Sequence, residues 1–227
     1  MIASYLPPSK EHILGTNDVG QDIFSEMVYG TRVSLYIGIF AAFIVTGVGT
    51  VLALVSGYFG GLADKIITAI TNIAMAVPSL PLTVLLIAYL NPGKWSLIIA
   101  ISITAWTGTA RILRARVMQL KELPFIKIEK TMGVHPAVIL FKHILPNIKD
   151  IILTRGAMAI SGAMMTEAGL SFLGLGEFGE KSWGSVLHYA FFRNSIMKKP
   201  VLVVCAAHRL HLRLRAGLYA HRLLWKD

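Results

Sequence analysis

The sequence contains three long stretches without a charged side chain, over residues 33–63, 66–93 and 95–110. A helix needs roughly 20 mostly apolar residues to cross the hydrocarbon core of a bilayer. Charged residues make up 15% of the chain, whereas soluble domains carry about 25%. The uneven distribution of charge excludes a disordered chain and argues against an ordinary soluble enzyme.

The apolar stretches predict an all-α polytopic protein of the cell (inner or plasma) membrane with about four spans. A cleaved signal peptide does not explain the first stretch, which is too long and lies too far into the chain. The alternative is a set of buried core helices in a soluble protein, but such helices rarely exceed 20 residues without a polar face. The four predicted spans are residues 33–59, 66–90, 95–113 and 151–175.

The distribution of Lys and Arg predicts the orientation of the chain. Residues 111–150 carry a net charge of +5, whereas residues 1–32 carry −2. Because cytoplasmic loops of membrane proteins are enriched in Lys and Arg, we expect segment 111–150 to be cytoplasmic and segment 1–32 to be external. The total of +10 also raises a soluble nucleic-acid binder as an alternative, which the apolar spans disfavour.

Two features inside the predicted spans are candidates for a translocation pathway. Pro78, Ser79 and Pro81 interrupt the second span, and prolines break or kink a helix because they lack an N–H group. The break is either a packing kink or unwound backbone that lines a pathway. Glu167 lies in the fourth span, where a carboxylate is costly. It is either a structural hydrogen-bonding group or a substrate contact.

The cytoplasmic segment contains a short amphipathic helix. Pro124 is suited to its first turn and Gly133 to its C-terminal cap. Phe125, Ile128 and Met132 fall on one face of this helix. The pattern fits a helix that docks into a groove of a partner protein and equally one that lies on anionic lipid.

With these residues in view, the chain resembles the membrane-spanning permease subunits of binding-protein-dependent ABC importers, in the dipeptide, oligopeptide and nickel branch. Four motifs match in order across residues 11–197. They are HILGTNDVGQDIFS at 12–25, GYFGG at 57–61 with Asp64, the loop at 125–147 that ends in HILPN, and EAGLSFLGLG at 167–176 followed by SWG at 182–184.

The resemblance implies a helical bundle like that of type I ABC importer permeases. It also implies a second permease subunit, cytoplasmic ATPase subunits that bind the ATP, and an external solute-binding protein. Segment 124–136 would be the coupling helix that contacts the ATPase. The implied coupling residues are Phe125, Lys127, Ile128, Glu129, Met132, Gly133, His143 and Pro146, and the candidate pathway residues are Pro78, Ser79, Pro81 and Glu167.

The chain departs from the family pattern in three places. The family's Glu-Ala-Ala triplet falls on residues 127–129, which read Lys-Ile-Glu, and Gln21 replaces the usual arginine before Asp22. A spanning helix is also expected before the first motif and after the last, and neither is present. We expect residues 1–32 to be an external segment and residues 33–197 to form the transmembrane domain.

Residues 198–227 form an atypical basic tail. One hypothesis is a truncated or frame-altered end, which makes a truncated, non-transporting membrane remnant the alternative function. The other is a genuine tail that binds an anionic surface.

The sequence predicts no enzymatic activity. It has no GxxxxGK[ST] phosphate loop, no HExxH and no GxSxG, and a single cysteine excludes a disulfide framework. We therefore expect no cofactor and no metal site in this chain, and no nucleic-acid partner. The motifs do not distinguish a peptide from nickel as the substrate.

Overall fold

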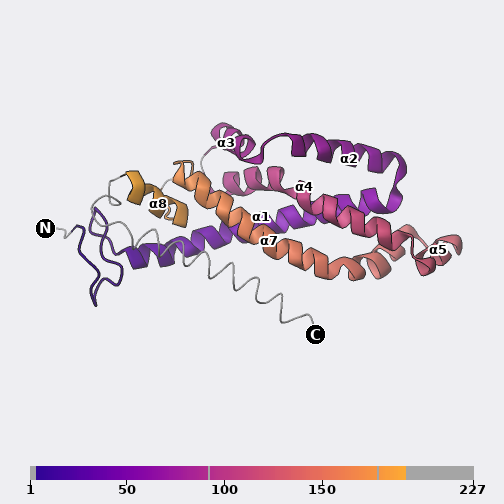
Figure 1. The fold of residues 1–227 in the computed structure, drawn as a ribbon, viewed down its shortest axis with the longest axis horizontal. Coiled ribbons are helices and arrows are strands. Elements are labelled where there is room, and N and C mark those ends of the chain that lie inside the picture. The colour runs from indigo at the N-terminus through magenta and orange to yellow at the C-terminus, as the bar shows by residue number, and fades with distance from the viewer. Residues whose placement is uncertain (1–3, 92, 178, 193–227) are drawn as a thin grey trace. The chain divides into compact units, whose positions relative to one another are not determined.

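The structure is a computed structural model that describes residues 4–91, 93–177 and 179–192. The regular structure in these ranges is helical apart from one isolated bridge between Thr16 and Asp22, which confirms the all-α prediction. The predicted tail, residues 198–227, lies outside the described residues. The helices (Figure 1) are α1 (Ile23–Phe59), α2 (Gly61–Ala76), α3 (Ser79–Tyr89), α4 (Lys94–Lys121), α5 (Pro124–Thr131), α6 (Pro136–Val138), the π-helical segment η1 (Ile139–Ile144), α7 (Leu145–Phe172) and α8 (Trp183–Phe192).

The first long helix begins ten residues before the predicted span because Asp22 caps it. The Ser25 backbone N–H donates to Asp22 Oδ2 at 2.8 Å, and the Ser25 hydroxyl donates to the same oxygen at 2.7 Å. Such a bond satisfies one of the free N–H groups in the first turn of a helix. Burial alone raises the pKa of Asp22, but the bonds from Ser25 and the nearby His12 ring outweigh it and hold the pKa below its usual value.

The second predicted span is interrupted as the prolines suggested. Helix α2 ends at Ala76 and α3 begins at Ser79, and the two helix axes are bent by 89° at this break. The loop expected at residues 60–65 is shorter than predicted, because α2 already begins at Gly61.

Two helices among the described residues, α1 and α4, are long and apolar enough to cross a membrane, and the bent pair α2–α3 makes a third if it is one span. Helix α7 matches α4 in length at 28 residues, but Arg155 and Glu167 reduce its apolar character. It remains the predicted fourth span.

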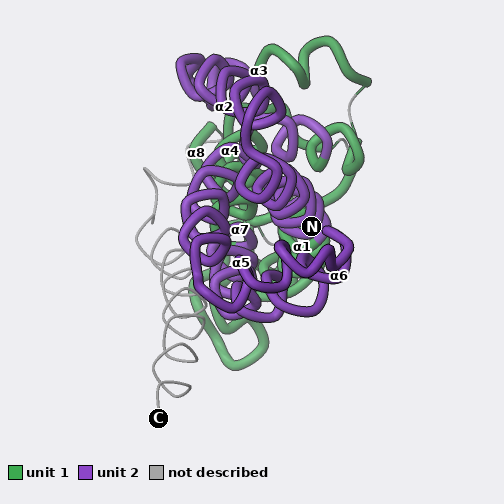
Figure 2. Tube along the Cα trace, turned by 90° about the vertical axis from the view of Figure 1, so that its right-hand side faces the viewer, with its two compact units in different colours: residues 1–39, 84–98, 161–227 green, residues 40–83, 99–160 purple. Residues whose placement is uncertain are grey.

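The chain divides into two compact units (Figure 2), each described by itself: unit 1 contains Met1–Ile39, Val84–Ile98 and Ser161–Asp227, and unit 2 contains Phe40–Thr83 and Ile99–Ile160. Unit 2 holds an apolar cluster in which α1 and α4 pack with the segment from α5 to the start of α7. Its buried members are Ala53, Tyr58, Leu113, Val117, Leu120, Ile126, Ile139, Ile144 and Ile148.

In unit 1 the SWG motif fixes α8 against α1 and α7. The Trp183 indole is buried, and its Nε1–H donates to Met27 O and to Thr31 Oγ1, each at 3.1 Å. Gly184 packs so closely on α7 that an added Cβ would lie 2.6 Å from Ser171 Cβ and would overlap the Ala168 carbonyl oxygen. The motif therefore packs α8 against α7, and a larger residue in place of Gly184 would displace α7.

Candidate functional site

The segment predicted to be cytoplasmic contains a short helix with a well-defined C-terminal end. Pro124 occupies the first turn of α5, and Gly133 follows its end with φ +77°. The N–H of Gly133 donates to Lys130 O at 3.2 Å, and that of Val134 donates to Glu129 O at 3.1 Å. These two bonds form a Schellman motif, which satisfies carbonyls at a helix end and favours glycine. The cap predicted at Gly133 is confirmed.

The apolar side chains of α5 divide between the core and the surface. Ile126 is 2% exposed and joins the apolar cluster of unit 2, so it anchors the helix. Phe125, Ile128 and Met132 are 45%, 59% and 77% exposed. These three residues fall on one face of the helix. A contiguous exposed apolar patch commonly marks a contact surface. We call these three residues the α5 surface.

Three coupling residues predicted from the sequence, Phe125, Glu129 and His143, lie together where α5 meets η1. His143 Nε2 is 2.9 Å from Glu129 Oε1, and the rings of Phe125 and His143 meet edge to face with centroids 6.3 Å apart. Glu129 also has a buried Oε2 atom with no partner among the described residues. The pair connects α5 to η1, so the orientation of the α5 surface is set by side chains and not only by the backbone.

Pro146 lies in a helix that continues without a gap from Pro136 to Phe172. Proline lacks an N–H and its ring clashes with the carbonyl four residues earlier. The preceding turn widens to the π-helical segment η1, in which the Leu145 N–H bonds to Leu140 O, and Asn147 Nδ2 donates to His143 O at 2.6 Å. The proline therefore shapes the junction of the loop with α7.

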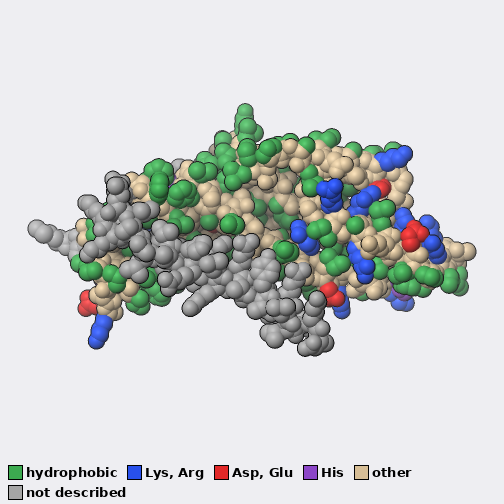
Figure 3. Space-filling view, in the orientation of Figure 1, with side chains coloured by type: hydrophobic (Ala, Val, Ile, Leu, Met, Phe, Trp, Pro, Cys, Tyr) green, Lys and Arg blue, Asp and Glu red, His purple; other side chains and the backbone are tan. Residues whose placement is uncertain are grey.

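Positive side chains are frequent on the elements next to α5. Figure 3 shows Lys and Arg gathered on unit 2 over the end of α4, α5 and the start of α7. Lys127 is exposed and its Nζ lies 2.9 Å from Glu122 Oε2, where its hydrogen bond and its charge lower the pKa of the Glu122 carboxyl. Such an exposed pair contributes little to stability.

The candidate pathway residues fall into two groups that belong to different units. Pro78, Ser79 and Pro81 are all exposed in unit 2. The hydroxyl of Thr83 donates to Ser79 O at 2.7 Å and so satisfies one carbonyl near the break. The kink is present, and its role in a pathway stays a prediction.

Glu167, in unit 1, is fully buried and holds two hydroxyl groups. Ser34 Oγ donates to its Oε2 at 2.8 Å, and Ser171 Oγ donates to its Oε1 at 2.7 Å. Each carboxylate oxygen thus has a donor, which removes the penalty of leaving a buried acceptor unpaired. This geometry favours the structural interpretation of Glu167 that the sequence left open.

One ion pair in unit 2 was not expected from the sequence. Arg114 Nε and Nη2 donate to Asp64 Oδ1 and Oδ2 at 2.5 and 2.6 Å, and Lys121 Nζ donates to Gly57 O at 3.3 Å. The sequence does single out Asp64, because it is the only Asp or Glu between Glu26 and Glu122. Its partner, 50 positions later, was not identifiable without the fold.

Residues 49–207 match the protein family described as binding-protein-dependent transport system inner membrane component. The chain is 41% identical over 181 residues to the oligopeptide transport system permease protein OppC of Bacillus subtilis, covering 79% of this chain and 59% of the relative. It is 38% identical over 184 residues to the glutathione transport system permease protein GsiD of Pectobacterium atrosepticum, covering 81% and 61%.

The chain is also 37% identical over 180 residues to the dipeptide transport system permease protein DppC of Bacillus subtilis, covering 79% of this chain and 56% of the relative. The chain therefore spans less than two thirds of the length of these relatives.

Solved structures agree on the fold. An inward-facing structure of the MetNI methionine ABC transporter gives a TM-score of 0.64 at 18% identity, over 87% of this chain and 97% of that one. A structure of an amino acid ABC transporter with histidines gives 0.61 at 15% identity, over 88% and 92%. The family match covers more than half of the chain, so the chain belongs to the inner membrane components of binding-protein-dependent transport systems, the family of permease subunits that its motifs resemble.

Proposed function

We propose that this chain is a permease subunit of an ATP-driven peptide importer. It forms the translocation pathway together with a second permease subunit, receives the solute from an external binding protein, and is driven by cytoplasmic ATPase subunits through α5. ATP is bound by those partners, since the chain has no phosphate-binding loop of its own.

The α5 surface is the observation that carries this proposal. Its three apolar side chains are exposed, yet the helix behind them is fixed by buried Ile126, by the turn at Gly133 and by the Glu129–His143 pair. A rigid helix with an apolar face suits a groove in a partner protein. Movement of α5 driven by the ATPase would pass through the Glu129–His143 pair to η1 and from there into α7, because the helical run from Pro136 to Phe172 has no gap.

Peptide is the substrate class that the relatives support. Three of them are named for oligopeptide, dipeptide and glutathione transport. These solutes share amide groups and a free carboxylate, and nickel shares neither. Nickel, the other substrate of this branch, serves as the contrasting probe.

Uptake in a strain that lacks its own counterpart of this permease tests the proposal. The chain is expressed with its second permease, ATPases and binding protein, and uptake of radiolabelled tetra-alanine and of radioactive nickel is measured with and without ATP depletion. We expect ATP-dependent uptake of the peptide only. Uptake of nickel alone contradicts the substrate class, and a membrane-inserted chain that supports neither uptake contradicts the transport function.

A further inference from the structure

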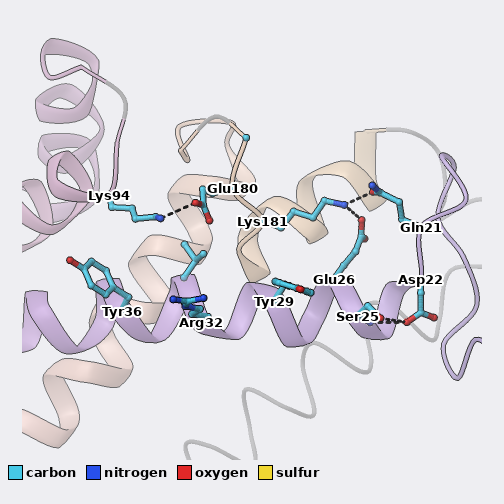
Figure 4. Close-up of a pocket in the computed structure, with 12 residues that line it drawn as sticks. Gln21, Asp22, Ser25, Glu26, Tyr29, Arg32, Tyr36, Lys94, Glu180 and Lys181 are labelled. Atoms are coloured by element: carbon cyan, nitrogen blue, oxygen red, sulfur yellow. Dashed lines mark hydrogen bonds and ion pairs between the residues drawn. The ribbon is translucent and has the colours of Figure 1, made fainter.

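Unit 1 contains an open cavity of about 880 Å³ along the start of α1 (Figure 4). The cavity is lined by α1 residues from the predicted external side, by Lys94 at the start of α4, and by the segment before α8. Binding sites for small ligands commonly enclose about 300–1,000 Å³. The size suits a short peptide or a comparably small molecule.

Most charges of this cavity are neutralised by neighbours. Lys94 Nζ lies 3.0 Å from Glu180 Oε1, and Lys181 is paired with Glu26 and bonds to Gln21. Asp22 is occupied by the cap of α1. The rim is therefore held together by ion pairs and is close to neutral.

Arg32 is the exception among the cavity's cations. It is exposed and lines the cavity, and within residues 4–91, 93–177 and 179–192 no carboxylate pairs with it. Figure 4 shows its guanidinium between Tyr29 and Tyr36 along α1, with no dashed line to a neighbour. These tyrosines stand three residues before and four residues after Arg32, the spacing that places side chains on one face of a helix.

A guanidinium in this position favours binding of a carboxylate. Its planar N–H groups match the two oxygens of a carboxylate, and the resulting bonds are stronger than those between neutral groups. The two tyrosines add aromatic surface on which a peptide chain can pack.

We propose that Arg32 binds the free terminal carboxylate of a short peptide in this cavity, before the peptide enters the pathway. The proposal rests on the proposed function, because peptide is the cargo that it assigns to the importer. The small volume of the cavity favours a peptide end over the broad face of a protein, whose stable contacts bury about 800 Å² on each partner.

The test uses the complete importer in proteoliposomes with two probes, tetra-alanine and its C-terminal amide, each at a concentration that saturates the binding protein. Uptake by Arg32→Gln is divided by uptake by the unmodified importer for each probe, so that any preference of the binding protein cancels. Loss of a charged hydrogen bond corresponds to roughly a tenfold effect or more, so we expect uptake of the free acid to fall about tenfold and that of the amide to stay within about twofold. Arg32→Lys should lie between.

Lys10→Gln is the matched control, because it removes one cation of the same segment outside the cavity. It should leave both ratios unchanged. An equal loss of both probes with Arg32→Gln overturns the proposal and assigns Arg32 to docking of the binding protein. Unchanged uptake of the free acid overturns it as well, and so does an equal selective loss with Lys10→Gln. If the unmodified importer takes up neither probe, the proposed function fails instead.

Discussion

Ser34 and Glu167 stand 133 positions apart in the sequence and are joined by a buried hydrogen bond of 2.8 Å. Both side chains are fully buried. With Ser171 on the other carboxylate oxygen, the bond ties α1 to α7 inside unit 1. Burying a carboxylate in an apolar setting costs free energy, and these hydrogen bonds offset that cost while they link the two helices.

The first prediction concerns the role of this carboxylate. Ser34→Ala should destabilise the protein by about 1–2 kcal/mol, because it leaves a buried acceptor unpaired. Glu167→Gln should also lower the thermal midpoint in detergent, while peptide uptake per folded importer stays near normal. Unchanged stability combined with lost uptake contradicts a structural role and indicates a substrate contact.

The second prediction concerns the close contact of Gly184 with α7. Gly184→Ala places a methyl group against Ala168 and Ser171, and overpacking of this kind costs about 1–3 kcal/mol. Gly162→Ala is the matched control, because an added Cβ there meets no atom within 4 Å. Thermal unfolding in detergent should show a lower midpoint for Gly184→Ala only. Equal effects of the two substitutions contradict the packing account.

The third prediction concerns the two-pronged ion pair between Asp64 and Arg114. Arg114→Gln should cost about 1.5–3 kcal/mol, the range for hydrogen bonds to charged groups, reduced by the partial exposure of both side chains. The exchanged double variant Asp64→Arg with Arg114→Asp should recover part of the loss. Arg116→Gln, on the exposed side of the same helix, should change stability little. No recovery in the double variant contradicts a direct pairwise interaction.

The sequence predicted those structural features that depend on a residue and its neighbours in the chain. The break at Pro78 and the cap at Gly133 each follow from one residue type in a recognisable setting, whereas the sequence left the role of Glu167 open. The partners of Glu167 illustrate the limit: Ser171 lies one helical turn away and is visible in the spacing, whereas Ser34 lies on another helix and depends on the packing of α1 with α7. The start of α1 was placed too late for a similar reason, because hydropathy marks apolar residues and not the cap at Asp22.

The fourth prediction concerns the turn after α5. Gly133→Leu forces a side chain into a left-handed conformation, at a cost of about 1–2 kcal/mol, and should tilt or fray α5. Gly133→Asn is the matched control, since asparagine tolerates this conformation better. ATP-dependent peptide uptake should fall markedly with leucine and less with asparagine. Equal activity of the leucine variant and the unmodified protein contradicts the need for this turn.

The central claim is that the α5 surface contacts the ATPase, and Met132→Glu tests it most directly. Met132 is 77% exposed, so the substitution adds a charge to the surface without disturbing the core. Val19→Glu, at a residue that is 50% exposed on the predicted external segment, is the control. The measurement is the affinity of the purified ATPase subunits for the permease in detergent, together with ATP-dependent uptake.

Burying an unpaired charge in an interface costs several kcal/mol, so Met132→Glu should weaken ATPase binding by about tenfold or more and abolish uptake, while Val19→Glu changes neither. Undiminished ATPase binding and uptake with Met132→Glu would contradict the account.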